Sequence, residues 1–122
     1  MSWDVRLRDP VDQRNYQVPH HEGGGTTIRV GYRESWLNVT YNYASIYRLA
    51  AKASGWEYPG MREWLQGRTA AETLPQMTAL AELLSGPPDK DYWAPTPGNA
   101  GTALRVLLEW ARAHPEGVWE VS

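Results

Sequence analysis

The residues best suited to binding chemistry are concentrated in the run WLNVTYNYASIYR at positions 36–48. Tyrosine rings in such a run can stack a nucleobase, while an arginine can form paired hydrogen bonds with a phosphate. The run therefore predicts a non-catalytic site for a nucleotide-like small molecule. An equally good interpretation is that Asn and Thr satisfy backbone groups where a strand meets a helix. The candidate ligand-binding residues in this run are Asn38, Thr40, Tyr41, Asn42, Tyr43 and Arg48.

A second segment of the same character contains Tyr92, Trp93 and Asn99. Asn42 and Asn99 each stand at an expected helix start, where free backbone N–H groups carry partial positive charge and can hold an anion. If the first and last helices pack side by side, both amides lie near the same end of the sheet, and the second segment can close over the first. We expect these two amides to matter more for binding than any histidine.

Catalytic or metal chemistry has one candidate, the run His20-His21-Glu22 followed by three glycines. Imidazole and carboxylate groups bind divalent metals and act as acids and bases, so a small hydrolase, with or without a metal, is the alternative function. Adjacent residues of an extended chain point to opposite sides, however, so the two imidazoles would not share one ion. The sequence therefore favours a polar loop here, and a protein without enzymatic activity, metal or cofactor.

Composition and charge limit the class of protein. A chain of 122 residues forms one domain, residues 1–122, and its formal net charge of -2 argues against direct binding to DNA phosphates. The absence of cysteine excludes disulfides and thiolate catalysis. The first residues carry charges where a signal peptide is apolar, and no apolar run approaches the length of a membrane span. These features favour the cytoplasm and argue against a membrane partner.

The aromatic and basic residues are unusual in type. There are seven Trp and seven Tyr but no Phe, more rings than one small core requires, so some are expected at the surface. Exposed aromatic rings commonly mark interfaces, which favours a protein partner or a homodimer. Arginine supplies most of the basic side chains and suits planar recognition, although a GC-rich genome explains that excess at least as well.

Alternation of apolar and polar residues predicts the strands. The run 36–41 places Leu37, Val39 and Tyr41 on one face and is expected at the centre of the sheet, leading directly into a helix capped by Asn42. The first two strands are expected to form a hairpin, and the third to pair antiparallel with the fourth. The predicted strands cover residues 3–7, 16–18, 26–32 and 36–41, with a further short strand at 118–121.

Helical spacing and capping signals predict the helices. A capping box at Thr69 is followed by a second at Thr73, and Pro75 favours Thr73 as the principal cap because proline is tolerated in a first turn. Thr96 and Pro97 open the last helix, where two early glycines permit close approach to the backbone or leave N–H groups for an anion. The first helix is expected to end at Gly55 and to turn Ile46, Leu49, Ala50 and Ala53 inward. The expected helices cover residues 46–53, 61–66, 73–84 and 97–113.

These elements predict an α+β fold, with a small antiparallel sheet of three to five mostly N-terminal strands and three or four helices packed on one face. The three large aromatic residues near a Pro-Gly turn, Trp56, Tyr58 and Trp64, are expected to cover the core rather than to form a ligand platform.

Three strings carry a resemblance to a known group of proteins. The strings WLNVTYNYASIYR, DYWAPTPGNA and HPEGVWEVS, together with the opening DVRLRDPV, resemble a family of small uncharacterised bacteriophage and prophage proteins. The resemblance spans nearly the whole chain and implies no known activity. It implies a phage accessory protein in the bacterial host cytoplasm, where such proteins often counteract host defence by trapping a nucleotide signal or binding a host protein.

Overall fold

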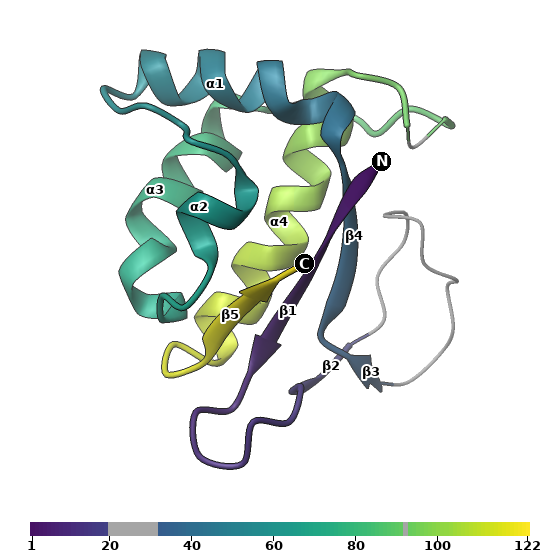
Figure 1. Cartoon of the computed structure of the whole chain (residues 1–122). Coiled ribbons are helices and arrows are strands. Elements are labelled where there is room, and N and C mark those ends of the chain that lie inside the picture. Colours follow the sequence, from purple (N-terminus) through teal and green to yellow (C-terminus); the bar gives the residue numbers. More distant parts are fainter. Residues whose placement is uncertain (20–31, 92) are drawn as a thin grey trace.

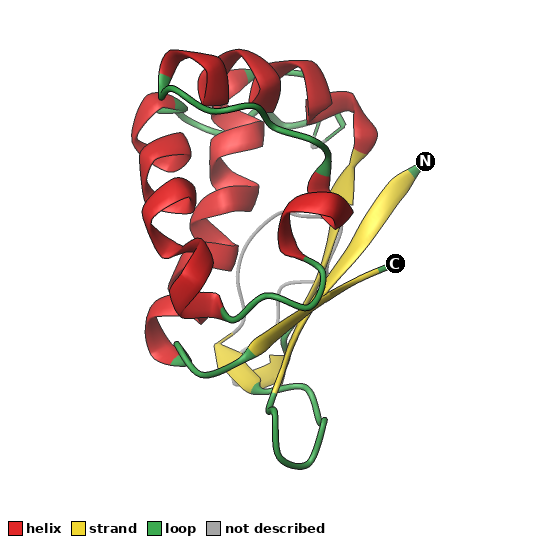
Figure 2. Cartoon of the chain, turned by 60° about the vertical axis from the view of Figure 1, so that its left-hand side comes forward, coloured by secondary structure: helices red, strands yellow, loops and turns green. Residues whose placement is uncertain are grey.

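The computed structural model of the chain describes residues 1–19, 32–91 and 93–122. The α+β class is confirmed: antiparallel strands, mostly from the N-terminal part, lie on one side and the helices pack on one face (Figures 1 and 2). The elements are β1 (Ser2–Arg8), β2 (Gln17–Pro19), β3 (Tyr32–Glu34), β4 (Trp36–Thr40), the 3₁₀ helix η1 (Tyr41–Tyr43), α1 (Ala44–Ala53), α2 (Met61–Leu65), α3 (Ala70–Leu83), α4 (Pro97–Ala113) and β5 (Val118–Val121).

The main sheet has the order β4-β1-β5 in the described part of the chain, and every pairing is antiparallel. The expectation that the strand at residues 36–41 is central was wrong, because β1 lies between β4 and β5. The predicted pairing of the third strand with the fourth was also wrong for its described end, since β3 pairs with β2 and β4 pairs with β1. The predicted hairpin of the first two strands forms only next to its loop, through the bridge Arg8↔Asn15 and the bond from Tyr16 N to Leu7 O, because β2 itself pairs with β3.

The inward face of the sheet carries the residues that alternation predicted. Val5 and Leu7 of β1 and Leu37 and Val39 of β4 are buried against the helices. β4 ends at Thr40, however, so Tyr41 belongs to η1 and does not continue the apolar face. The C-terminal strand β5 also forms as predicted, and it buries Trp119 beneath α3.

The face that helix α1 turns to the core was predicted only in part. Ala50 is buried and Ile46 is half-buried against the core, as predicted, but the other buried residues are Tyr47 and Ala51. Leu49, 71% exposed, and Ala53 face solvent instead. The Tyr47 hydroxyl donates to the carbonyl of Ala100 at 2.9 Å, which fixes α1 beside α4. An aliphatic periodicity missed this face because a tyrosine, and not a leucine, supplies the central packing side chain.

Capping explains where the helices begin. The principal cap of α3 is Thr69, with a complete capping box to Glu72, and the preference for Thr73 was wrong. Pro75 lies inside α3, and Thr73 is a buried helical residue whose hydroxyl donates to Ala70 O at 2.9 Å. The caps at Thr96 and Pro97 are confirmed.

Candidate functional site

A groove runs along one side of α1. Its floor residues Ala44, Arg48 and Lys52 follow each other at spacings of four, so they share one face of the helix. The connection between α1 and α2 runs back alongside α1 and forms the opposite wall (Figures 1 and 2). The chain turns back at Gly55, which has a φ of 89°. The N–H groups of Gly55 and Trp56 donate to the carbonyls of Lys52 and Ala51, so the helix ends in a Schellman motif.

The groove, which we call the α1 groove, consists of two hollows that share Arg48, Tyr58 and Pro59. The sheet-side hollow has a volume of about 430 Å³ and adds Trp3, Tyr41, Ala44, Gly60 and Glu63 to these three residues. The distal hollow has a volume of about 610 Å³ and adds Lys52, Trp56 and Glu57. Both volumes fall in the usual range for small-molecule sites.

Aromatic rings line both hollows. Tyr41 is 37% exposed and packs on Trp3 with ring centroids 4.9 Å apart. Tyr58 is buried between Tyr47 and Trp56, at centroid distances of 5.5 and 6.4 Å. The Nε1 of Trp56 is buried and lacks a hydrogen-bond partner among the described residues. The walls therefore offer stacking surfaces that the core holds in place.

The electrostatics of the groove centre on Arg48. Its guanidinium makes neither an ion pair nor a hydrogen bond within the described part of the chain, so its donors are available to a ligand. Burial, reinforced by the carboxylate of Glu63, raises the pKa of Tyr58, and the charge of Arg48 opposes that shift.

Two of the predicted ligand residues, Tyr41 and Arg48, thus meet in the sheet-side hollow. Asn42 and Asn99 meet elsewhere, on the segment 89–95. The Nδ2 of Asn42 donates to Trp93 O at 2.9 Å, and that of Asn99 donates to Asp91 O at 2.8 Å and Ala94 O at 3.0 Å. The two amides do lie near one end of the fold, but both donate their hydrogen bonds to backbone carbonyl groups and not toward the groove.

The side chain of Asn99 makes more hydrogen bonds to the protein than that of Asn42. It is 1% exposed, and its Oδ1 accepts from Asp89 N at 2.7 Å in addition to its donor bonds. Asn42 is exposed and does not cap the helix as predicted. Thr40 caps η1 instead, accepting from Asn42 N at 3.2 Å.

The remaining predicted residues lie apart from the groove. Tyr43 is fully buried in the core, and Trp93 is 47% exposed on the segment after α3. Asn38 lies on the outer face of the sheet, where its Nδ2 donates to Ser2 Oγ at 2.7 Å and Asp4 Oδ1 at 3.1 Å. Tyr92 lies outside the described residues.

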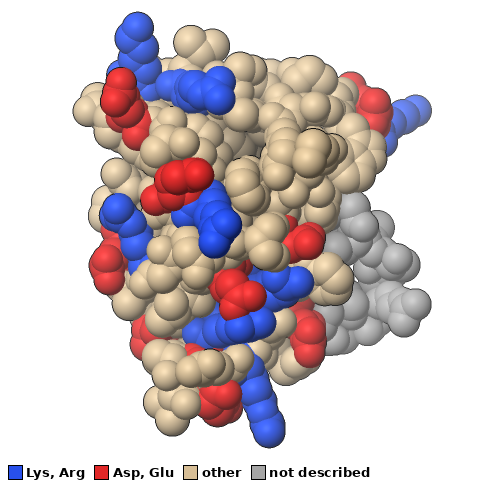
Figure 3. Space-filling view, in the orientation of Figure 1, with Lys and Arg blue, Asp and Glu red and all other residues tan. Residues whose placement is uncertain are grey.

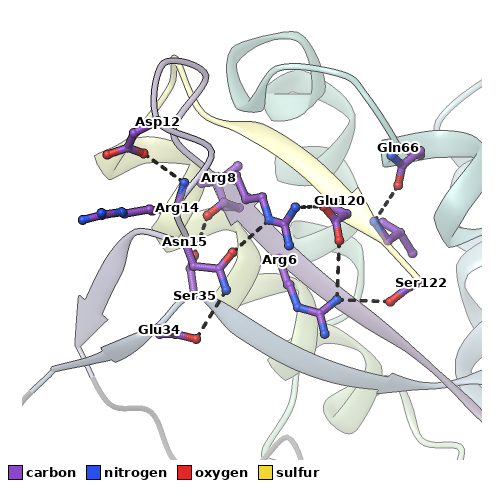
Figure 4. A network of polar contacts seen from close by, with 12 residues as sticks. Arg6, Arg8, Asp12, Arg14, Asn15, Glu34, Ser35, Gln66, Glu120 and Ser122 are labelled. Carbon is purple, nitrogen blue, oxygen red and sulfur yellow. Dashed lines mark hydrogen bonds and ion pairs between the residues drawn. The ribbon is translucent and has the colours of Figure 1, made fainter.

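The outer face of the sheet is organised by ion pairs. Glu120 of β5 pairs with both Arg6, at 3.8 Å, and Arg8 of β1 (Figure 4). Arg8 Nε also donates to Asn15 Oδ1 at 3.2 Å, which fixes the loop after β1. On the side seen in Figure 3, basic and acidic side chains are interspersed and form no large patch of one sign.

The catalytic candidates His20, His21 and Glu22 lie outside the described residues. Among the residues that are described, no group of three or more His, Asp and Glu is placed to hold a metal ion. His114 stacks on Tyr16 with ring centroids 3.9 Å apart, and Tyr16 donates to Glu116 Oε1 at 3.2 Å. Burial, followed by the charge of Glu116, raises the pKa of Tyr16 to about 12.

Sequence reasoning missed most of the groove, including Trp3, Lys52, Trp56 and Tyr58 and the carboxylates of Glu57 and Glu63. Lys52 was detectable, because it follows Arg48 by one helical turn on an exposed face. Trp3 was not, because its place beside Tyr41 depends on the pairing of β1 with β4. Trp56 and Tyr58 were expected to cover the core, and Tyr58 does so at 7% exposure while still lining both hollows.

Within the described ranges, no helix combines the length and the apolar character needed to cross a bilayer. Comparison of the chain with protein-family models, curated proteins and solved structures gives no match.

Proposed function

We propose that the protein is a non-catalytic binder that takes a planar, anionic small molecule of the nucleotide type in the α1 groove. The observation that carries the proposal is the position of Arg48, a cation without a protein partner in the described chain, between two hollows with aromatic walls. A base would stack against the aromatic wall, and the phosphate would accept hydrogen bonds from the guanidinium.

The wider setting rests on the resemblance to small phage proteins. In that setting the protein is a phage accessory protein of the host cytoplasm, which counteracts host defence by sequestering a nucleotide signal. Sequestration requires binding, for which the groove supplies aromatic walls and the cations Arg48 and Lys52.

Calorimetry with AMP, ADP-ribose and a panel of cyclic dinucleotides tests the proposal. We expect at least one of these compounds to bind with micromolar or lower Kd, and Arg48→Ala to weaken that binding at least about tenfold, as for loss of a charge-assisted hydrogen bond. Arg112→Ala is the matched control, because Arg112 is exposed near the end of α4, away from the groove. Absence of heat from the whole panel, or equal binding by the two variants, would contradict the proposal.

A protein partner is the second candidate, and exposed aromatic residues outside the groove favour it. Trp36 is 42% exposed on the sheet and Trp93 47% exposed beyond α3. Exposed tryptophans are common anchors of interfaces. Capture of one stoichiometric host protein that is lost with Trp36→Ala or Trp93→Ala would support this function, and light scattering of the purified protein would detect the homodimer form.

The hydrolase alternative stays a prediction for His20, His21 and Glu22. Elemental analysis of the purified protein tests its metal form: a stoichiometric transition metal that disappears when both histidines become Ala would favour it.

A further inference from the structure

The order of chemical groups along the α1 groove deepens the proposed function and rests on it. Ala44, Arg48 and Lys52 lie at successive turns of α1, so with a rise of about 1.5 Å per residue the floor extends about 12 Å. Arg48 stands at the middle of this line and borders both hollows. A ligand that contacts Arg48 can therefore extend in two directions.

Each direction ends at an aromatic surface of its own. The sheet-side hollow has Tyr41, backed by Trp3, and the distal hollow has Trp56, backed by Trp64 at a centroid distance of 5.4 Å. Tyr58 borders both hollows at the divide. The groove thus offers two separate stacking positions and not one continuous apolar slot.

Each hollow also contains one carboxylate, Glu63 on the sheet side and Glu57 on the distal side, and both residues are exposed. A carboxylate repels phosphate but accepts hydrogen bonds from the exocyclic amino groups of adenine, guanine or cytosine. Uracil has no exocyclic amino group, and its single ring N–H lies between two carbonyl oxygens that a carboxylate repels. The positive charge, in contrast, is confined to Arg48 and to Lys52 one turn further along.

We propose that the groove recognises a dinucleotide whose phosphate lies on Arg48 and whose two amino-bearing bases occupy the two hollows, one against Tyr41 and Glu63 and the other against Trp56 and Glu57. The ligand class is therefore a two-base phosphodiester, with adenine, guanine or cytosine preferred over uracil.

Calorimetry with ApA, UpU and the methyl ester of AMP tests this assignment, because the ester carries the single charge of a phosphodiester and only one base. A second stacked base increases affinity about tenfold or more. We expect ApA to bind at least about tenfold more tightly than either the ester or UpU. Equal binding of ApA and the ester, or no binding by any of the three at millimolar concentration, would overturn the two-base assignment. The proposed function would fail with it only if AMP, ADP-ribose and the cyclic dinucleotides also gave no binding.

The carboxylates are tested by Glu57→Gln and Glu63→Gln. Each variant should reduce the preference for ApA over UpU, and the double variant should bring the two affinities within about threefold. Glu82→Gln, at an exposed position of α3, is the control and should keep the wild-type preference. Circular dichroism confirms that every variant is folded. A double variant that keeps the full preference would contradict the role of the carboxylates.

Discussion

At the scale of single residues, the two asparagines that the sequence singled out have different structural roles. Asn99 is buried with hydrogen bonds to the backbone of residues 89, 91 and 94, whereas Asn42 is exposed and holds only the carbonyl of Trp93 by its Nδ2. Residue type and a helix-start position predicted that both amides lie near the same end of the sheet, but not that they bind the backbone before α4. The sequence did not show whether these amides bind a ligand or the protein's own backbone, because that depends on the path of the chain between α3 and α4.

Replacing Asn99 should therefore cost far more stability than replacing Asn42. Asn99→Ala leaves buried backbone groups without partners and should lower the free energy of unfolding by about 2–4 kcal/mol, whereas Asn42→Ala should cost about 1 kcal/mol or less. Urea denaturation of the two variants measures the difference. Equal losses would show that the segment 89–95 does not depend on the buried amide, and retained nucleotide binding in Asn42→Ala would place that residue outside the ligand site.

The raised pKa of Tyr16 predicts a loss of stability at alkaline pH. Folding shifts this pKa from its usual value of 10.0 to about 12, through burial and then the charge of Glu116, so the folded state favours the neutral phenol. The stabilisation is complete below pH 10 and is lost as the pH rises toward 12, because the unfolded chain ionises first. Tyr16→Phe should flatten the fall in unfolding free energy over this range, although Tyr58, whose pKa is also raised, contributes in the same sense. An unchanged slope would contradict the assignment.

At the scale of elements, local sequence signals predicted where helices begin and end better than which face of a helix is buried. The helix starts at Thr96 and Pro97 and the end at Gly55 were readable because each cap depends on neighbours within a few residues. The buried face of α1 was not readable, since Tyr47 packs inward while Leu49 faces solvent. The start of α3 was predicted too late for a related reason. Proline disfavours the helical turn before Pro75, but the hydrogen bond between Thr73 and Trp119 stabilises that turn.

The start of α4 depends on the two glycines that the sequence marked. A Cβ at Gly101 would collide with the carbonyl oxygen of Leu84, and one at Gly98 with that of Pro87, so the close approach is to the chain after α3. Helix propensity alone predicts that Gly101→Ala stabilises the protein by about 1 kcal/mol. We expect the opposite sign, a loss of about 2 kcal/mol or more from overpacking, measured by thermal or urea unfolding. Ser45→Ala, at an exposed position in α1, is the control and should be neutral or mildly stabilising.

At the scale of the whole molecule, the fold depends on contacts between distant parts of the chain. β1 pairs with β5, so residues near positions 5 and 121 are neighbours, and the N–H groups of Ala70 and Ala71 donate to the carbonyls of Gly117 and Pro115. Alternation showed that each strand has an apolar face, but it carries no information on which strand pairs with which. For the same reason the sequence located Arg48 and Tyr41 of the groove and could not supply the wall opposite them.

Trp119 is the residue at which sheet and helices are joined. It is 1% exposed, its Nε1 donates to Thr73 Oγ1 at 2.9 Å, and its backbone exchanges hydrogen bonds of 3.0 Å with Gly67 and Arg68. Trp119→Ala should therefore lower the free energy of unfolding by about 3–5 kcal/mol, a large part of the stability of a domain of this size.

Trp36→Ala is the matched control for Trp119→Ala, because it removes the same side chain from a 42% exposed position on the outer face of the sheet. Its cost should stay near 1 kcal/mol, since the ring loses the hydrogen bond to Asp4 Oδ1 and the contact with Arg6 but leaves no buried cavity. Unfolding followed by far- and near-ultraviolet circular dichroism distinguishes the two positions. If Trp119 joins the layers, its variant should lose helical and tertiary signals in one transition at lower urea, whereas persistence of the helical signal after tertiary structure is lost would show that the helices fold without the sheet.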